Sequence, residues 1–477
     1  MDIKIYPLFL NNEWVTSGPY LEVTNPANGE LLARVSTIDR ARVAQALADA
    51  HAAFQDWRKL PGKTRGMFLH RIADEVERRS VEIARLISLE NGKPLAQSVG
   101  EVAMTVDHLR WFAEEARRAY GRIIPHQVEG KRNLVIKSPV GVVGAISPWN
   151  FPLTLGIRKA APAMAAGCPV LLKPSELTPL STLVFAECVA AAKLPPGVFQ
   201  VVLGDAPAIG QEFLANPLCR KVSFTGSTAV GKQLIAGAAA TVKPLSLELG
   251  GQAPLLVFDD IDLGRAVEGT FGAKMRNAGQ TCITANRVYV QRSIYDEFLA
   301  AFTARVQAAK VGDAFDPNVE IGPLINERGL QKALTHIADA VARGARVVCG
   351  GQRLGERGFF LAPTVLADVP AEALCMAEET FAPVAPVVPF DTEEEALALA
   401  NGVPFGLSAY AFTGSLDRAF RLMEGLEAGT IGINDGVPTS STAPFGGMKQ
   451  SGWGRELGVE GLEAFLETKH VSLGLQI

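Results

Sequence analysis

Short apolar runs alternate with helical patterns from residue 138 onward, and this alternation restricts the possible folds more than any other feature of the sequence. The first runs end near glycine or proline and are separated by helical patterns; the runs lie at 140–146, 170–172 and 199–202, and the helical patterns at 157–166, 180–192 and 207–215. Apolar strands separated by helices are typical of a parallel sheet that is buried on both faces. The sequence therefore predicts an α/β fold with a doubly wound sheet.

The alternation recurs from residue 254 to about residue 433, which predicts a second α/β domain. A chain of 477 residues is longer than a single hydrophobic core usually supports, so at least two domains are expected. The contents of hydrophobic residues (48%) and charged residues (20%) are normal for a globular protein. We place the domain boundary near Gly250 and Gly251.

Two other regions do not show this alternation of strands and helices. Residues 39–119 read as helical, with long amphipathic stretches at 40–57 and 64–90. Residues 121–137 and 463–477 have a β-like character that suits neither sheet, and from the residues alone they are edge strands.

Charge and cysteine content limit the partners of the chain. The net charge is −4, and acidic and basic residues are interspersed, which argues against nucleic acid or an anionic membrane as the main partner. The N-terminus lacks the apolar core of a signal peptide, and the longest apolar stretch, 160–172, is too short for a membrane span. The six cysteines show no CxxC spacing. We expect a cytoplasmic protein with reduced thiols and no metal site.

The segment FTGSTAVGKQ, residues 224–233, nearly matches a phosphate-binding loop. A strand, a glycine turn and a helix place free backbone N–H groups at the start of the helix, where they can bind a phosphate or pyrophosphate. The motif alone is equally typical of an ordinary strand–helix turn. Gln233 stands where a nucleotide triphosphatase would have Ser or Thr for Mg²⁺, and no acidic Mg²⁺ ligand is obvious, so this alternative is disfavoured.

Three further segments contain groups suited to covalent catalysis. Glu248 lies in LELGG (247–251) and Cys282 in NAGQTC (277–282). A thiolate can form an acyl intermediate, and a carboxylate can activate the water that releases it. Asn150, in PWNFP (148–152), is held between prolines and aromatics, so its amide could stabilise an oxyanion. The alternatives are a small core cysteine and a turn-capping asparagine.

In order and separation these segments resemble those of the aldehyde dehydrogenase family, from about residue 25 to the C-terminus. The resemblance implies that Cys282 attacks the aldehyde, that Asn150 and the Cys282 N–H stabilise the oxyanion, and that Glu248 deprotonates the hydrolytic water. An inactive protein on the same scaffold would lack one of these three residues. The resemblance also implies a domain plan: an NAD-binding domain (1–120, 138–249, with 446–462 returning to it), a catalytic domain (250–445) and oligomerisation strands (121–137, 463–477). Such strands would join subunits into a homodimer or homotetramer.

The same resemblance identifies candidate cofactor residues. Gly226 and Ser227 would contact the NAD pyrophosphate; in ETF (379–381), Glu379 would bind the nicotinamide ribose and Phe381 the ring, although Ala382 replaces the usual glycine. The complete expected set is Trp149, Lys173, Pro174, Ser175, Glu176, Gly226, Ser227, Leu249, Glu379 and Phe381. A carboxylate at Glu176 can accept both adenine-ribose hydroxyls and would repel a 2′-phosphate, so NAD is expected to be preferred over NADP. The alternative is a solvated loop in which Lys173 pairs with Glu176.

Two arginines indicate the substrate. Arg158 follows Asn150 by eight residues and Arg276 precedes Cys282 by six. Members of the family that oxidise simple aldehydes usually have aromatic residues at both positions, whereas guanidinium groups would bind a carboxylate at the far end of the substrate. The segment KMRNAGQTC (274–282) resembles that of dehydrogenases for succinate semialdehyde and 2-oxoglutarate semialdehyde. Glutarate semialdehyde and general aldehydes stay open as alternatives, and surface ion pairs are the alternative for the arginines.

Other residues complete the expected substrate site. Ser440 or Ser441 would bind the same carboxylate, and Phe445, in PFGGMK (444–449), would line the back of the aldehyde site. Some family members carry a second cysteine two residues after the nucleophile, which forms a redox-switch disulfide. Thr284 stands there in this chain, so we expect no such switch.

Overall fold

The computed structural model describes residues 3–475, and its first domain is built on a six-stranded sheet with the order β10-β9-β8-β11-β12-β22. These strands are β8 (Val142–Ile146), β9 (Val170–Lys173), β10 (Phe199–Val201), β11 (Cys219–Thr225), β12 (Leu245–Glu248) and β22 (Gly452–Trp453). The first five are parallel. Their spatial order reverses between β8 and β11, and open α/β sheets bind ligands beyond the carboxyl ends of the strands at such a point. The α/β fold class is therefore confirmed, with β22 as an antiparallel edge strand.

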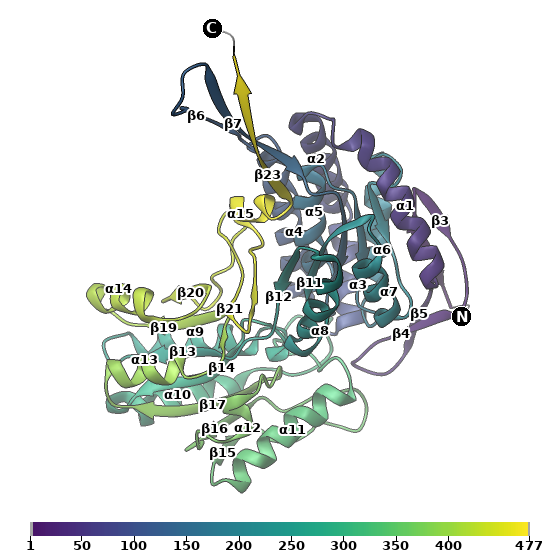
Figure 1. The fold of residues 1–477 in the computed structure, drawn as a ribbon. Helices are drawn as coiled ribbons and strands as arrows, with labels where there is room; N and C mark the ends of the chain where they lie inside the picture. The colour runs from purple at the N-terminus through teal and green to yellow at the C-terminus, as the bar shows by residue number, and fades with distance from the viewer. Residues whose placement is uncertain (1–2, 476–477) are drawn as a thin grey trace.

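Helices cover both faces of this sheet (Figure 1). They are α1 (Arg40–Trp57), α2 (Gly62–Arg78), α3 (Ser80–Asn91), α4 (Leu95–Glu115), α5 (Thr154–Ala166), α6 (Leu180–Ala191), α7 (Ala206–Ala215) and α8 (Thr228–Ala238), followed by a 3-10 turn, η1 (Ala239–Thr241). The single amphipathic stretch expected at 64–90 is wrong, because the helix breaks at Arg79. The Arg79 guanidinium pairs there with Glu82 and with Glu187 of α6. Within residues 3–475, no helix is long and apolar enough to cross a membrane.

Short strands that were not predicted from the sequence precede these helices. They are β1 (Ile5–Tyr6), β2 (Leu8–Leu10), β3 (Glu13–Val15), β4 (Tyr20–Thr24) and β5 (Leu31–Ser36). They form a three-stranded sheet and a two-stranded hairpin. Their short length and irregular burial explain why no strand periodicity was visible.

The second domain contains a seven-stranded sheet with the order β15-β16-β17-β14-β13-β19-β20. Its strands are β13 (Ala253–Val257), β14 (Ala285–Gln291), β15 (Arg346–Cys349), β16 (Thr364–Ala367), β17 (Val384–Phe390), β19 (Ser408–Phe412) and β20 (Thr430–Ile433), with β15 antiparallel. Its helices are α9 (Leu263–Met275), α10 (Tyr295–Ala308), α11 (Glu327–Ala342), α12 (Leu374–Ala377), α13 (Glu393–Asn401) and α14 (Leu416–Gly425), with 3-10 turns η2 (Arg276–Gly279) and η3 (Arg292–Ile294). A two-stranded sheet joins β18 (Phe405–Gly406) to β21 (Met448–Lys449). The two domains have separate hydrophobic cores.

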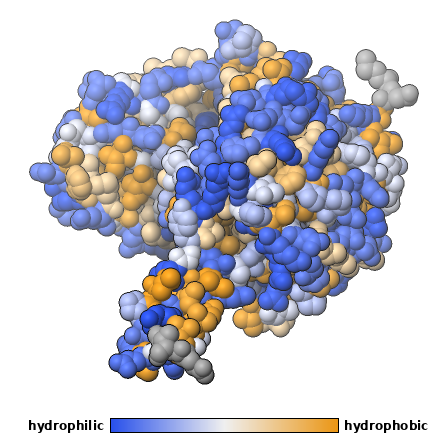
Figure 2. Space-filling model, turned by 90° about the horizontal axis from the view of Figure 1, so that it is seen from above, coloured by the Kyte–Doolittle hydropathy of each residue, from blue (hydrophilic) through white to orange (hydrophobic). Residues whose placement is uncertain are grey.

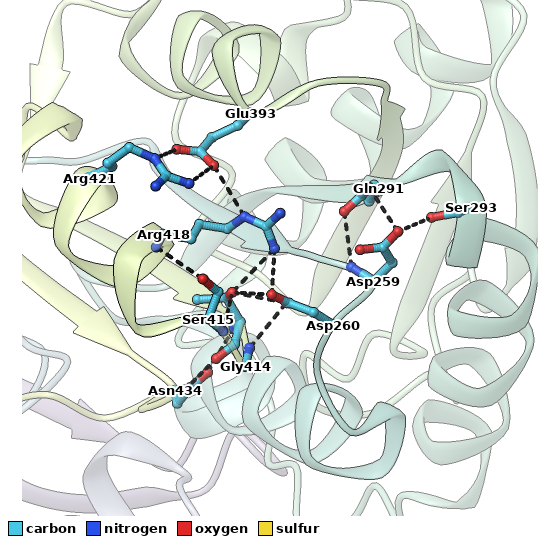
Figure 3. A network of polar contacts seen from close by, with 11 residues as sticks. Asp259, Asp260, Gln291, Ser293, Glu393, Gly414, Ser415, Arg418, Arg421 and Asn434 are labelled. Atoms are coloured by element: carbon cyan, nitrogen blue, oxygen red, sulfur yellow. Dashed lines mark hydrogen bonds and ion pairs between the residues drawn. The ribbon is translucent and has the colours of Figure 1, made fainter.

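A network of ion pairs and hydrogen bonds lies at the carboxyl ends of strands in the second sheet (Figure 3). Asp260, which follows β13, accepts hydrogen bonds from the Thr413 hydroxyl (2.9 Å) and from Arg418 of α14 (2.6 Å). Glu393 at the start of α13 pairs with both Arg418 and Arg421. The network therefore fixes α13 and α14 to the strand ends.

A three-stranded antiparallel flap protrudes from the first domain (Figure 1). It consists of β6 (Arg122–Ile124), β7 (Lys131–Pro139) and β23 (Leu466–Gly474). Hydrophobic side chains gather on its surface (Figure 2), among them Ile123, which is 74% exposed, Val128 and Ile136. Of the segment expected at 463–477, residue 463 ends helix α15 (Gly458–Glu463), and residues 476 and 477 lie outside the described residues. Exposed apolar surface of this kind marks a contact surface, so a role in joining subunits stays our prediction.

Candidate functional site

Cys282 lies where two cavities meet, between η2 and β14. One cavity has a volume of about 440 Å³ and the other of about 380 Å³, and the Cys282 side chain lines both. The preceding turn places Asn277 and Ala278 in the left-handed backbone region, with φ of 50° and 54°. Because the Cys282 side chain lines both cavities, it can react with a ligand in one cavity while a second ligand occupies the other.

The smaller cavity lies beyond the carboxyl ends of β8, β11 and β12, at the switch point of the first sheet. Of the residues expected to bind the cofactor, six line it: Trp149, Gly226, Ser227, Leu249, Glu379 and Phe381. The Trp149 and Phe381 rings meet edge to face, with centroids 5.5 Å apart. Ser227 caps α8 by accepting a hydrogen bond from the Val230 N–H, and the first N–H groups of α8 lack partners within the helix. The cavity thus offers aromatic walls and an anion site, as a dinucleotide requires.

The other four expected cofactor residues do not line this cavity. Lys173, Pro174, Ser175 and Glu176 lie at and after the end of β9, where the Lys173 ammonium donates to Glu176 at 3.1 Å. Burial acts to raise the pKa of Glu176, but the Lys173 cation and hydrogen bonds outweigh it, so the pKa is below its usual value. Arg328, which the sequence did not single out, lines the cavity and also acts on Glu176. Glu176 is therefore an ionised, half-exposed carboxylate near the cavity.

The larger cavity brings together all five residues expected to bind substrate: Arg158, Arg276, Ser440, Ser441 and Phe445. The Arg158 guanidinium lies 5.0 Å from the centre of the Phe445 ring, and that of Arg276 lies 5.6 Å from the Phe151 ring. Neither guanidinium has a carboxylate within 4.0 Å among residues 3–475, so the structure does not favour the surface ion-pair alternative. Burial lowers the pKa of both arginines, which indicates that a bound anion would stabilise their charges.

The two candidate serines differ in their surroundings. Ser440 is exposed, and its hydroxyl shares a hydrogen bond of 2.9 Å with Thr442. Ser441 is buried, and its hydroxyl has no hydrogen-bond partner among the described side chains and backbone. Ser441 is thus the better placed of the two to bind a ligand in the cavity.

Asn150 is buried beside Cys282 in the smaller cavity. Its amide nitrogen donates to the carbonyl of Gln280 at 3.1 Å. Because an amide carries two N–H groups, one is held by Gln280 and the second is free to donate to a ligand.

Glu248 ends β12 and is buried, with neither carboxylate oxygen hydrogen-bonded to the described protein. Burial, and then the nearby Glu456, raise the pKa of Glu248 well above its usual value. Lys159 of α5 donates to both Glu456 and the Thr225 hydroxyl, the latter at 2.6 Å. Lys159 and Glu456 were not predicted from the sequence, because they are 297 residues apart and no local motif connects them.

Burial, and then the nearby Glu379, raise the pKa of the Cys282 thiol to about 12, although Arg158 opposes the rise. The resting thiol is therefore protonated near neutral pH, and a base must accept its proton before it becomes a nucleophile. Glu248 is close enough to influence this pKa and has the raised pKa that suits a base. Among residues 3–475, no group of three or more His, Cys, Asp or Glu side chains is arranged to hold a metal ion.

The cavity at the switch point of the first sheet, and the cysteine between this cavity and a second one, are typical of enzymes that use a dinucleotide and a cysteine nucleophile. The chain belongs to the aldehyde dehydrogenase family, whose model matches residues 14–471. This confirms the family that the sequence motifs predicted, and with it an enzyme that oxidises aldehydes with NAD or NADP.

Similar proteins carry more specific names. The chain is 48% identical to a mitochondrial succinate-semialdehyde dehydrogenase of Arabidopsis thaliana, over 98% of this chain and 88% of that one. It is 46% identical to a glutarate-semialdehyde dehydrogenase of Pseudomonas aeruginosa, over 99% of both chains. Among solved structures, one described as an E. coli NADP dependent enzyme has a TM-score of 0.98 and 47% identity, over 99% of this chain and 98% of that chain.

Proposed function

We propose that this enzyme oxidises a short aldehyde with a carboxylate at its far end, such as succinate semialdehyde, to the corresponding acid. The observation that carries the proposal is the pair of guanidinium groups, Arg158 and Arg276, in the cavity that ends at Cys282. Arginines without acidic partners in a largely buried cavity favour a substrate that carries a negatively charged group. The names of the two semialdehyde dehydrogenases above support this substrate class. Glutarate or 2-oxoglutarate semialdehyde is the alternative within it.

In the first half of the reaction, Cys282 attacks the aldehyde carbon after its proton passes to Glu248. The free N–H of Asn150 and the backbone N–H of Cys282 then stabilise the oxyanion. A nicotinamide dinucleotide in the smaller cavity would supply the hydride acceptor; Trp149 and Phe381, which line this cavity, would form the walls of its site, and Glu379 would bind a ribose hydroxyl. Loss of hydride from the substrate carbon leaves a thioester on Cys282.

Before the second half, Glu248 must pass on the proton that it took from the thiol. The ionised carboxylate then removes a proton from water, which attacks the thioester and releases the acid from the Cys282 sulfur. Glu248 must then pass this proton on. Glu456, bonded to Lys159, is the next group, and Lys159 continues the chain to Thr225. We infer that these residues conduct the proton away from the site.

At the far end of the substrate, Arg158 and Arg276 would bind the carboxylate, and Ser441 would donate to it rather than Ser440. Ser441 is favoured because it is buried in the same cavity, whereas Ser440 is exposed and bonded to Thr442. Phe445 would pack against the carbon chain while its ring contacts Arg158.

We further propose that NAD is preferred over NADP. The ionised Glu176, held by Lys173 at the end of β9, would accept the adenine-ribose hydroxyls and repel a 2′-phosphate. In this arrangement Lys173, Pro174 and Ser175 form the turn that presents the carboxylate. Arg328 opposes this preference, because a nearby arginine can bind a 2′-phosphate.

We also infer that the flap joins subunits into a homodimer or homotetramer, because its exposed Ile123, Val128 and Ile136 would be covered there. The cytoplasmic location expected from the sequence stays a prediction.

The proposed activity is tested by recording NADH formation with succinate semialdehyde, glutarate semialdehyde and butanal. The proposal expects kcat/KM to be highest for one of the two carboxylated aldehydes and higher with NAD than with NADP. Equal kcat/KM for butanal and both semialdehydes would leave a general aldehyde dehydrogenase instead.

A further inference from the structure

We propose that Lys93 and Glu101 are positioning residues, which form a buried ion pair that holds the loop carrying Asn150 in its reactive place. The inference rests on the proposed function, since it assumes that Asn150 stabilises the oxyanion. Neither residue touches the cavities, and neither belongs to a motif that the sequence analysis singled out.

The pair is completely buried. The side chains of Lys93 and Glu101 have no exposed surface, and their charged atoms lie 2.7 Å apart. Lys93 lies in the loop between α3 and α4, and Glu101 lies within α4. The pair therefore belongs to the helical layer behind the site.

Both members of the pair contact the backbone of the Asn150 loop. The Lys93 ammonium donates to the carbonyl of Asn150 at 2.7 Å and lies 4.0 Å from the centre of the Phe151 ring. The second Glu101 oxygen accepts from the N–H groups of Leu153 (3.0 Å) and Thr154 (3.2 Å). The pair is thus hydrogen-bonded to the backbone of this loop at Asn150, Leu153 and Thr154.

The same contacts connect this loop to the segment that carries the nucleophile. Asn277 donates its side-chain N–H to the Asn150 carbonyl at 3.0 Å, so this oxygen accepts from both Asn277 and Lys93. Gln97, between Lys93 and Glu101 in the chain, accepts from the backbone N–H of Asn277 at 2.9 Å. Residues 93–101 therefore fix the Asn150 loop relative to the turn before Cys282.

A buried ion pair is a poor way to gain stability, because removing two charges from water costs about as much as their attraction returns. An apolar pair of similar volume could fill the same space. It could not donate to the Asn150 carbonyl or accept from the two N–H groups. Since a misplacement of about 1 Å at a reacting group can lower a rate about 100-fold, holding this loop is the use that explains the pair.

The test uses the double variant Lys93→Met/Glu101→Gln, which leaves no unpaired charge and keeps an oxygen for Leu153 and Thr154. We expect its kcat/KM for the aldehyde to fall about 10- to 100-fold, with the Kd for NAD unchanged. Lys243→Met is the matched control: Lys243 is also buried and donates to the carbonyls of Phe213 and Asn216 (2.5 and 2.9 Å), away from both cavities. Its kcat/KM should stay near that of the wild type.

A mutant cycle with Asn150→Ala separates positioning from a general structural role. If the pair acts through Asn150, adding the double variant to Asn150→Ala should lower kcat/KM by less than about threefold. If the two losses multiply in full, or if Lys243→Met causes the same loss, the positioning role is wrong. If Asn150→Ala alone has normal activity, the failure lies in the proposed function. Should the double variant not fold, Glu101→Gln alone is measured in the same cycle and is judged by the same outcomes.

Discussion

Gly446 lies directly against the carboxylate of Glu248: a methyl group on the Gly446 Cα would come within 2.8 Å of Glu248 Oε1. It would also come within 2.8 Å of the carbonyl oxygen of Gly454, so the backbone leaves no room for the methyl to turn away. The glycine at position 446 thus leaves room for the carboxylate of Glu248, the proposed base.

The first prediction follows from this contact. Gly446→Ala should displace the Glu248 carboxylate and slow release of the acid, lowering kcat at least tenfold while NAD binding is retained, since misplacing a base costs about 10- to 100-fold. Steady-state kinetics with a titration of NAD binding measure both effects. Gly100→Ala is the control, because no heavy atom lies within 4 Å of the methyl it adds. Wild-type kcat in Gly446→Ala would show that this contact has no role in catalysis.

The second prediction separates the thiol from the base. Cys282→Ala should abolish NADH formation while NAD still binds, because the other residues of the smaller cavity are intact. Glu248→Gln lacks the base for the thiol as well as the base for the water, so it should form at most one NADH per site, at a rate that increases with pH as the thiol ionises unaided, and should then slow because the thioester is not hydrolysed. Rapid-mixing absorbance measures the size of this burst. Normal turnover in either variant would contradict the assigned roles.

The third prediction concerns pH. The pKa of Glu248 is raised by burial and by Glu456, so at low pH this carboxyl is protonated and cannot accept a proton. The Cys282 thiol, with a pKa of about 12, likewise becomes easier to ionise as the pH rises. The kcat/KM for the aldehyde should therefore increase with pH across the neutral range and fall in acid. A profile that is flat, or that falls with rising pH, would exclude Glu248 as the base.

The fourth prediction concerns the cofactor. Glu176→Ser should reduce the preference for NAD over NADP by about 1 kcal/mol, at the low end of the effect of a nearby like charge, because Glu176 is half exposed and water screens it. The ratio of kcat/KM values for the two cofactors measures this change. Arg328→Ala is the matched test of the opposing cation and should weaken NADP more than NAD. A wild-type enzyme that prefers NADP would show that Arg328 outweighs Glu176.

The sequence predicted the α/β fold class because its buried strands are apolar runs with glycine or proline at their ends. The Asn150, Gly226 and Cys282 segments were predicted to form the site because each is a short motif that resembles the corresponding motif of the family. Residues outside such motifs escaped prediction: Lys159 meets Glu456 only after the chain folds. The break at Arg79, where φ is −101° and ψ is 14°, was also not predicted, because the amphipathic pattern continues through it.

The fifth prediction tests the arginine clamp. Arg158→Ala and Arg276→Ala should each lower kcat/KM for succinate semialdehyde about 30- to 1,000-fold, or about 2–4 kcal/mol, because one guanidinium alone leaves the substrate carboxylate half-paired. Both variants should keep most of their activity on butanal. The double variant should lose less than the product of the two single losses, because both residues bind one group. Ser441→Ala should show a smaller loss of the same kind, and Ser440→Ala little change.

Selection of a carboxylated aldehyde by the cavity at Cys282 can be measured as the ratio of kcat/KM for succinate semialdehyde to kcat/KM for butanal. This ratio is determined in the wild type and in Arg158→Ala. Succinate semialdehyde and butanal have the same number of carbons, so the ratio reports the terminal carboxylate and not chain length. We expect a ratio far above one in the wild type and a ratio near one in the variant. A wild-type ratio near one, or a high ratio that Arg158→Ala leaves unchanged, would show that the cavity does not select for the terminal carboxylate through Arg158.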